Sequence, residues 1–468
     1  MAAVEFLEQR IRSEFAFQPT ECQSRLFRAL AVFLCGEGEI LIVNGYAGTG
    51  KTEAVGAAVR AMKSLGMRFR LMAPTGRAAK VLSGYTGESA MTVHKQIYRQ
   101  KSMDAAGGKF VLDMNKDRRT CYMVDEASLI GMDSGTSLFG SGDLLEDLVA
   151  YIRQGEGNRL VLIGDNAQLP PVGLDASPAL DPSYVGMYGH VDYVLLDQVV
   201  RQADTSGILY NATVVRHAVM TGACDSFPKL ETRNVKDVER IGGGDLIEAI
   251  GDAVSRYGIE ETVVLCRSNR RANRYNQGIR GTVLSMEDTL VRGDRLMVVK
   301  NCYQFLDKVE ELDFIANGDI AELMRISRYE ERYGLHFAEA VLAFPDYGNI
   351  EINAKVILDT LTSESASLSA EQQRNLYEGV FADYENISTK RRRNAAVRED
   401  PYYNALQIKY STAITCHKSQ GGQWKCVFID NAFWHDSISL EDLKWLYTAI
   451  TRATEKLYLV NFNPGFFK

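Results

Sequence analysis

Residues 41–55, LIVNGYAGTGKTEAV, constrain the fold more than any other stretch of the chain. The apolar run at its start is typical of a short buried strand, and apolar residues recur at helical spacing from Lys51 to Gly66. Between strand and helix, residues 45–52 match the pattern G-x-x-x-x-G-K-[ST]. Backbone N–H groups of such a loop surround a phosphate, and the helix dipole favours its charge. The sequence therefore predicts an α/β fold with a nucleotide site.

The residue types in this loop suit ATP and Mg²⁺. Lys51 is placed to reach the β- and γ-phosphates, and the Thr52 hydroxyl to ligate Mg²⁺. The remaining loop residues are expected to bind ATP through their backbone: Gly45, Tyr46, Ala47, Gly48, Thr49 and Gly50.

Two later strands are expected to complete the site. In TCYMVDEASLIG, residues 120–131, an apolar strand ends in Asp125, a candidate Mg²⁺ ligand, and in Glu126, which we expect to polarise the attacking water. In RLVLIGDNAQLPPVG, residues 159–173, Gln168 follows a third strand closely and can reach the γ-phosphate region. An ordinary strand and loop stopped by proline explains that third stretch equally well.

Composition sets outer limits on function. The 468 residues carry a formal net charge of -7, which argues against a surface coated in positive charge but leaves room for a narrow basic groove. No apolar run is long enough to span a membrane, and no secretory signal is visible. The eight cysteines form no C-x-x-C pair, so we expect no zinc. They suit a reducing cytoplasm, with buried side chains at Cys35, Cys121, Cys266 and Cys426.

These three motifs, in this order, resemble the ATPase core of superfamily 1 helicases. Further stretches resemble the other motifs of that family: FAFQPTECQ the Q motif, LMAPTGRAAKVL motif Ia, TVHKQIY motif Ib, LDQVVRQ motif IV, ITCHKSQGGQW motif V and LYTAITRA motif VI. Together they span residues 15–453. The spelling of GDNAQLPPVG and HKSQG is most similar to the 1B branch, which comprises RecD-like, Dda-like and Pif-type DNA helicases.

The resemblance implies further ATP contacts. Gln23 reads adenine, Gly421 joins the ATP-binding set, and Arg201 and Arg452 place positive charge on the γ-phosphate when two lobes close. Several relatives carry an acid where this chain has Gln423, so no role is carried over to that position.

The resemblance also implies contacts to single-stranded DNA. Arg267, Asn269 and Asn273 cluster where the family touches DNA, although a solvated helix face explains them too. Sequence-independent phosphate contacts are expected from motifs Ia, Ib and V, namely from Pro74, Thr75, Gly76, Arg77, His94, Thr415, His417 and Lys418.

The family pattern implies two RecA-like P-loop NTPase lobes, one of residues 1–95 and 120–189 and one of residues 190–300 and 401–468. Residues 96–119 are expected to form a hairpin closed by Gly107-Gly108. Phe110 could then stack on an end base pair as a wedge, or simply pin the hairpin to its lobe. Residues 301–400 are expected to hold an SH3-like β barrel. The basic run from Lys390 to Arg393 fits a phosphate contact or a solvated surface.

The implied activity is an ATP-dependent 5′-to-3′ DNA helicase that moves on single-stranded DNA and opens duplex junctions, in repair, recombination or replication. A single-strand-binding protein is a conceivable partner, and bacterial or phage-type cytoplasm the expected location. Two alternatives stay open. One is an RNA helicase of the same superfamily, and the other is a DNA-end-binding adaptor subunit without activity.

Overall fold

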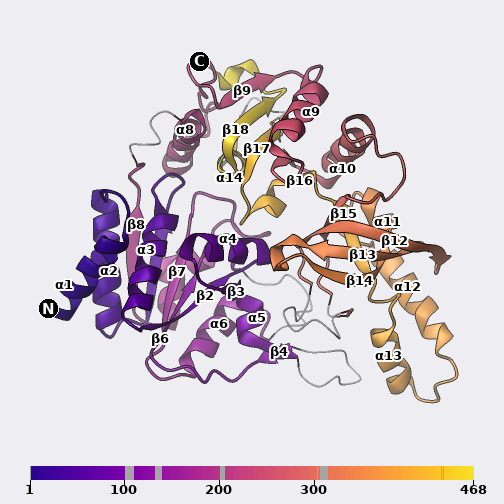
Figure 1. Cartoon of the computed structure of the whole chain (residues 1–468), viewed down its shortest axis with the longest axis horizontal. Coiled ribbons are helices and arrows are strands. Elements are labelled where there is room, and N and C mark those ends of the chain that lie inside the picture. Colours follow the sequence, from indigo (N-terminus) through magenta and orange to yellow (C-terminus); the bar gives the residue numbers. More distant parts are fainter. Residues whose placement is uncertain are drawn as a thin grey trace.

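The computed structural model describes residues 2–100, 110–131, 140–200, 206–302, 304–305, 315–433, 435 and 437–467. These residues form two α/β lobes and a β barrel. In Figure 1 the first lobe lies at the left and bottom in indigo and purple, the second lies at the top, and the barrel lies at the right in orange. The expected α/β class with two lobes is confirmed by two separate parallel sheets.

The first lobe is built on a six-stranded parallel sheet in the order β3-β2-β6-β7-β1-β8. Every residue of β1 and β6 is buried, which explains their continuous apolar runs. The strands are β1 (Ile40–Gly45), β2 (Arg68–Ala73), β3 (Ala90–Thr92), β6 (Thr120–Val124), β7 (Arg159–Gly164) and β8 (Val191–Leu196). The helices are α1 (Ala2–Glu14), α2 (Glu21–Cys35), α3 (Lys51–Ser64), α4 (Gly76–Thr86), α5 (Val93–Ile97), α6 (Leu144–Arg153) and α7 (Pro182–Val185).

The expected end of the first lobe at residue 189 is wrong. Strand β8 pairs in parallel with β1 from Ile40 to Gly45, so the lobe continues to at least Leu196. The chain then passes over the phosphate loop, where the Val200 amide donates to the Gly48 carbonyl at 3.0 Å. The boundary moves because β8, which lies beyond residue 189, pairs with β1 and so belongs to the first sheet.

The second lobe has a five-stranded parallel sheet in the order β16-β10-β17-β18-β9. Its last helix begins with a capping box in which Ser439 and Asp442 satisfy each other's backbone amides. The strands are β9 (Val238–Ile241), β10 (Thr262–Cys266), β16 (Ala413–Thr415), β17 (Trp424–Asp430) and β18 (Ala453–Val460). The helices are α8 (Gly207–Thr221), α9 (Leu246–Tyr257), α10 (Asn269–Gly278) and α14 (Leu440–Ile450).

The barrel is closed and has five strands. They are β11 (Arg295–Val298), β12 (Ile320–Arg332), β13 (Leu335–Phe344), β14 (Ile350–Ile357) and β15 (Leu406–Tyr410). A barrel inserted near residues 301–400 is therefore confirmed, but its bounds are wider than expected. Closure requires the first strand to pair with the last, and Leu296 does pair with Tyr410, both outside the expected range.

Three helices connect β14 to β15: α11 (Asp359–Thr362), α12 (Ala370–Asp383) and α13 (Lys390–Glu399). Leu376 and Val380 of α12 share an apolar cluster with Phe337 of β13, so these helices pack on the outside of the barrel. The basic run opens α13. Its last member, Arg393, donates to the backbone carbonyls of Glu385 and Ile387, while the three residues before it are exposed.

The hairpin of the first lobe is present as two antiparallel strands, β4 (Tyr98–Gln100) and β5 (Phe110–Leu112). Its Gly107-Gly108 turn lies outside the described residues. Phe110 is buried in the core beneath the first sheet, in the cluster that contains Tyr122 and Leu148. The expectation that Phe110 stacks on a base pair is therefore wrong, because its ring anchors the hairpin to its own lobe.

All eight cysteines are free thiols. Cys121, Cys266 and Cys426 are buried as expected, but Cys35 is exposed, because it ends α2 on the outer side of the helix. In the part of the chain that the structure describes, no helix combines the length and apolarity needed to cross a membrane.

A buried ion pair joins the second lobe to the barrel. Arg280 follows α10, and its guanidinium donates from two nitrogens to Asp294, the residue before β11, at 2.8 and 2.9 Å. Both side chains are buried, so removing one partner leaves an uncompensated charge.

Arg280→Ala is expected to destabilise the protein by about 3–5 kcal/mol. Lys425→Ala is the matched control. It removes the exposed pair with Glu455, at 3.5 Å, and is expected to cost about 0–1 kcal/mol. Thermal unfolding followed by calorimetry measures both. Equal shifts of the two unfolding midpoints would show that the Arg280 pair is not a structural requirement.

Candidate nucleotide site between the two lobes

The phosphate loop has the geometry that its sequence predicts. It links the end of β1 to the start of α3, and Gly48 and Gly50 adopt φ of 75° and 70°. This left-handed region favours glycine. A side chain at position 50 would also collide with Gln23, whose Nε2 atom would lie 2.5 Å from its Cβ. Backbone N–H groups at the start of α3 are thus free of side-chain caps, as a phosphate site requires.

Gln23 lies against this loop. Its Nε2 donates to the Thr49 carbonyl and its Oε1 accepts from the Thr20 amide, both at 2.9 Å. The second bond belongs to the capping box of α2. Both ends of the amide are engaged in holding the loop, and adenine recognition by Gln23 stays a prediction.

Asp125 and Glu126 follow β6 at the same edge of the sheet as the phosphate loop. Asp125 accepts from the Glu126 amide at 2.9 Å and from the Tyr85 hydroxyl at 2.5 Å. Glu126 has a φ of 52°, a strained backbone conformation for a residue with a side chain. Its Oε2 atom is buried and accepts no hydrogen bond from any described residue. Such an orphaned acceptor is available for a water molecule or a substrate.

The charges around Glu126 come from both lobes. Burial raises the pKa of its carboxyl group, and Lys51 from the first lobe and Arg452 from the second lower it. The same two cations lower the pKa of Asp165, which burial also raises. Two carboxylates and two cations therefore share one buried site, where desolvation strengthens every electrostatic interaction.

Asp165 is a site residue that the sequence reasoning missed. It follows β7 and accepts from the Ala167 amide at 3.0 Å and from the Tyr447 hydroxyl at 2.6 Å. Its position at the carboxyl end of a central parallel strand was the available signal. Gln168, which was predicted, is buried nearby, and its Oε1 atom has no hydrogen-bond partner among the described residues.

Helix α14 of the second lobe docks on the loop after β7. The Leu169 amide donates to Thr448 Oγ1 at 2.8 Å, and the Leu169 carbonyl accepts from Gln420 Nε2 at 2.7 Å. Tyr46 of the phosphate loop and Leu169 belong to the main apolar core of the second lobe. The two lobes are therefore in direct polar and apolar contact across the site.

Arg452 is held by the backbone of its own lobe. Its guanidinium donates to the carbonyls of Thr448 and Gly422, each at 3.1 Å. This buried position is consistent with its electrostatic effect on Glu126. Arg201, the other predicted arginine, lies outside the described residues.

The nearest neighbours of Gly421 lie in motif Ia. Gly421 adopts a φ of 74°, and a Cβ there would lie 3.0 Å from Ala78 and 3.1 Å from Thr75, both in motif Ia. Motif V therefore packs on the start of α4 at this position, and the expected ATP contact of Gly421 stays a prediction.

The predicted DNA contacts of the first lobe gather at the start of α4 and on α5. Thr75 caps α4 by accepting from the Ala78 amide at 3.2 Å, and the half-buried Pro74 precedes it. Arg77 stacks on the Trp424 ring at 3.9 Å and donates to the Gln423 carbonyl, so it contacts the second lobe. The remaining two are Gly76, which is buried beside Tyr347 of the barrel, and the half-buried His94 on α5.

In the second lobe, Thr415, His417 and Lys418 lie together at the end of β16. Lys418 donates to Asn317 Oδ1 at 2.6 Å, and burial lowers its pKa to about 8. Burial and the neighbouring Arg267 lower the pKa of His417. All three are half-buried, and their DNA contacts stay a prediction.

Of two other predicted DNA contacts, that of Asn273 is wrong and that of Arg267 stays a prediction. Arg267 forms ion pairs with Asp442 at 2.6 Å and Glu441 at 3.0 Å. Asn273 is buried, and its amide donates to the carbonyls of Thr362 and Ser363, which ties α10 to the barrel helices. Both side chains serve the fold. Asn269, at the start of α10, is half-exposed and stays a prediction.

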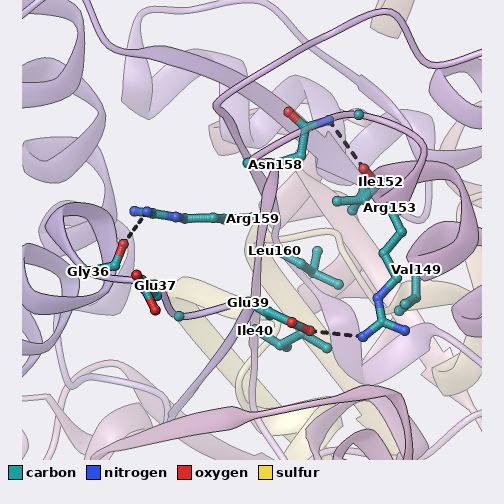
Figure 2. Close-up of a pocket in the computed structure, with 13 residues that line it drawn as sticks. Gly36, Glu37, Glu39, Ile40, Val149, Ile152, Arg153, Asn158, Arg159 and Leu160 are labelled. Atoms are coloured by element: carbon teal, nitrogen blue, oxygen red, sulfur yellow. Dashed lines mark hydrogen bonds and ion pairs between the residues drawn. The ribbon is translucent and has the colours of Figure 1, made fainter.

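A pocket of about 370 Å³ lies at the opposite edge of the first sheet, where β1 and β7 begin (Figure 2). Three of its charged side chains have partners: Arg153 pairs with Glu39 at 2.9 Å, and Arg159 donates to the Gly36 carbonyl. Ligands of parallel α/β sheets bind at the carboxyl ends of the strands, so this pocket is not the nucleotide site.

Known protein families match both lobes. The AAA domain family matches residues 22–220, and the UvrD-like helicase C-terminal domain matches residues 410–460. The ATP-dependent RecD2 DNA helicase of Deinococcus radiodurans is 23% identical over 434 residues, which cover 90% of this chain. The two lobes are therefore similar to an AAA domain and to a helicase C-terminal domain, and most of the chain is similar to a RecD2 helicase.

Other proteins are similar over most of the chain. This chain spans 46% of the length of the Deinococcus protein. An uncharacterized protein of Acanthamoeba polyphaga mimivirus is 21% identical over 489 residues, covering 90% of this chain and 94% of that protein. A Bacteroides Pif1 helicase in complex with ADP-AlF3 and single-stranded DNA aligns with 14% identity and a TM-score of 0.48, covering 97% of this chain and 95% of that one.

Tyr85→Phe is expected to weaken the Mg²⁺-dependent binding of ATP. The hydroxyl donates a hydrogen bond that orients Asp125. Its loss should therefore raise the Mg²⁺ concentration for half-maximal binding about 10-fold, as for other groups that orient a metal ligand. Titration of a fluorescent ATP analogue with Mg²⁺ measures this.

Tyr384→Phe provides the matched control, since it removes a tyrosine–aspartate bond of 2.9 Å to Asp400 in the barrel helices. An unchanged Mg²⁺ requirement in Tyr85→Phe would mean that Asp125 is positioned without Tyr85.

Proposed function

We propose that this chain is an ATP-driven translocase that moves 5′-to-3′ on single-stranded DNA and unwinds duplex DNA. The observation that carries the proposal is the buried Glu126 carboxylate, which lies under the influence of Lys51 from one lobe and Arg452 from the other. A site assembled from two lobes links hydrolysis to their closure. In this proposal each of the two parallel sheets is the core of a RecA-like lobe, and the closed five-stranded barrel is the SH3-like insertion.

The residues of the site fit ATP with Mg²⁺. Lys51 and the amides at the start of α3 would hold the phosphates, and Thr52 and Asp125 would hold the metal. Bound Mg²⁺ would neutralise charge that develops on the phosphates. Glu126 has a free, buried oxygen and a raised pKa, both of which suit a group that accepts a proton from the attacking water.

Positive charge from the second lobe would complete the reaction. Arg452 is held rigidly by backbone carbonyls, so it is preorganised to stabilise negative charge on the γ-phosphate. We assign Arg201 the same task by family resemblance. Gln168, with its buried and unpartnered oxygen, would orient the water or the γ-phosphate.

Grips on DNA would come from both lobes. Thr75 and His94 stand on the first lobe, and Thr415, His417 and Lys418 on the second. Small polar and cationic groups of this kind make sequence-independent phosphate contacts. The printed name of the Deinococcus relative supports DNA as the substrate and ATP as the fuel. The hairpin stays the proposed wedge, without Phe110.

Two alternatives differ in measurable ways. An RNA helicase of the same superfamily would be stimulated by single-stranded RNA, and a DNA-end-binding adaptor would bind DNA without hydrolysing ATP. Since Lys51, Asp125, Glu126 and Arg452 are all present, we favour an active motor.

Glu126→Gln is expected to lower the kcat for ATP hydrolysis by about 10²–10⁴-fold, the usual contribution of a general base. The isosteric amide keeps the volume of the side chain, so ATP and DNA binding should persist. Phosphate release in the presence of single-stranded DNA measures the rate. Near wild-type hydrolysis would remove Glu126 from the mechanism.

Strand polarity is tested with partial duplexes that carry either a 5′ or a 3′ single-stranded tail, in DNA and in RNA, with ATP. The 5′-tailed DNA is expected to be unwound and the 3′-tailed DNA to remain intact. Preferential unwinding from 3′ tails would contradict the proposed direction, and a preference for RNA tails would favour the RNA helicase.

A further inference from the structure

Tyr447 of the second lobe reaches into the nucleotide site of the first. Its side chain projects from α14 and is 1% exposed. The phenol oxygen accepts a hydrogen bond from the Ala47 amide at 2.9 Å, and the phenol proton is donated to Asp165 Oδ2 at 2.6 Å. One hydroxyl therefore joins the phosphate loop, the loop after β7 and motif VI.

Both partners of this hydroxyl belong to the site already described. Ala47 lies in the phosphate loop, whose N–H groups are the donors that surround a phosphate. Asp165 is a buried carboxylate that feels the charges of Lys51 and Arg452. Thr448 of α14 accepts a hydrogen bond from the Leu169 amide, in the loop after β7. Among the described hydrogen bonds of α14, only that of Tyr447 comes from an amide of the phosphate loop.

The geometry makes these two bonds interdependent. A phenol has one proton to donate, so the acceptance from Ala47 and the donation to Asp165 polarise each other. Separation of the lobes would break both bonds together and leave Asp165 with the Ala167 amide as its described backbone donor. A change in the phosphate loop would likewise be transmitted to α14.

The other end of this connection is the DNA grip. Arg267, at the end of β10, pairs with Glu441 and Asp442 in the first turn of α14, and Cys416 beside His417 donates to the Trp445 carbonyl. A shift of α14 would thus be felt at the residues proposed to hold DNA on the second lobe.

We propose that Tyr447 is a positioning residue that couples occupancy of the phosphate loop to closure of the lobes, and through α14 to the grip on single-stranded DNA. This inference rests on the proposed function. It assigns Tyr447 no contact with the reacting atoms, since Tyr447 acts through Ala47 and Asp165.

The test compares the affinity for fluorescent single-stranded DNA with and without a non-hydrolysable ATP analogue and Mg²⁺. In the wild-type protein the two dissociation constants should differ, typically by about 5–150-fold for coupled sites. In Tyr447→Phe the ring remains and only the hydroxyl is lost. The ratio should fall towards one, kcat should fall, and the affinity for the nucleotide alone should be kept, because the Ala47 amide becomes free for phosphate.

Two control variants separate this role from general stability. Tyr275→Phe removes a tyrosine–aspartate bond of 2.7 Å to Asp430 within the second lobe. Thr448→Val removes the bond from the Leu169 amide across the same interface without touching the phosphate loop. Both should retain most of the wild-type ratio. Loss of the ratio in all three variants, or its retention in Tyr447→Phe, would overturn the proposal.

Amide hydrogen exchange in the phosphate loop of the wild-type protein tests the Tyr447 contact without any variant. Without nucleotide, the Ala47 amide should be protected, and rapid exchange would overturn the proposal even if Tyr447→Phe failed to fold. A wild-type protein with no ATP-dependent change in DNA affinity would instead contradict the proposed function itself. A coupled wild-type protein with an equally coupled Tyr447→Phe variant would contradict only the role of Tyr447.

Discussion

Two buried carboxylates, Glu126 and Asp165, determine the electrostatics of the site between the lobes. Burial raises the pKa of each, and the charged forms are tolerable in a dry interface only with cations nearby. Among the described residues, the first lobe contributes Lys51. The second supplies Arg452, fixed by backbone carbonyls that leave it little freedom to turn away. The cations that act on these two carboxyl groups therefore come from both lobes.

The barrel extends this dependence to a third part of the chain. Its loops touch both proposed DNA grips: Lys80 of α4 pairs with Asp346 at 3.2 Å, and Lys418 donates to Asn317. Asp319 and Tyr347 of the barrel lie next to Gly76. The Tyr347 hydroxyl donates a hydrogen bond to Asp319, and burial raises the pKa of Asp319 to about 7. Motion of the barrel would consequently alter the surroundings of both grips at once.

Three residues that were predicted to contact DNA have partners within the protein. Arg267, Asn273 and Phe110 have side chains that serve nucleic acids well, but the same amide, guanidinium and ring also serve a fold. Two carboxylates of α14 compensate the Arg267 charge, carbonyls of α11 satisfy the Asn273 amide, and the Phe110 ring fills the core beneath the first sheet. The local sequence cannot distinguish a role in DNA binding from a role in the fold, because the partners within the protein lie up to 175 residues away in the chain.

The sequence by itself determined the phosphate loop, the carboxylates after β6 and the alternation of strands and helices, because each depends on neighbours within a few residues: glycines for positive φ, and an apolar run for a buried strand. Only the tertiary structure decided that β8 belongs to the first sheet, that the barrel closes through strands outside residues 301–400, and that Asp165 meets Tyr447 across 282 residues of chain. Such contacts depend on how separate elements pack, and no local pattern encodes the register in which two distant surfaces meet.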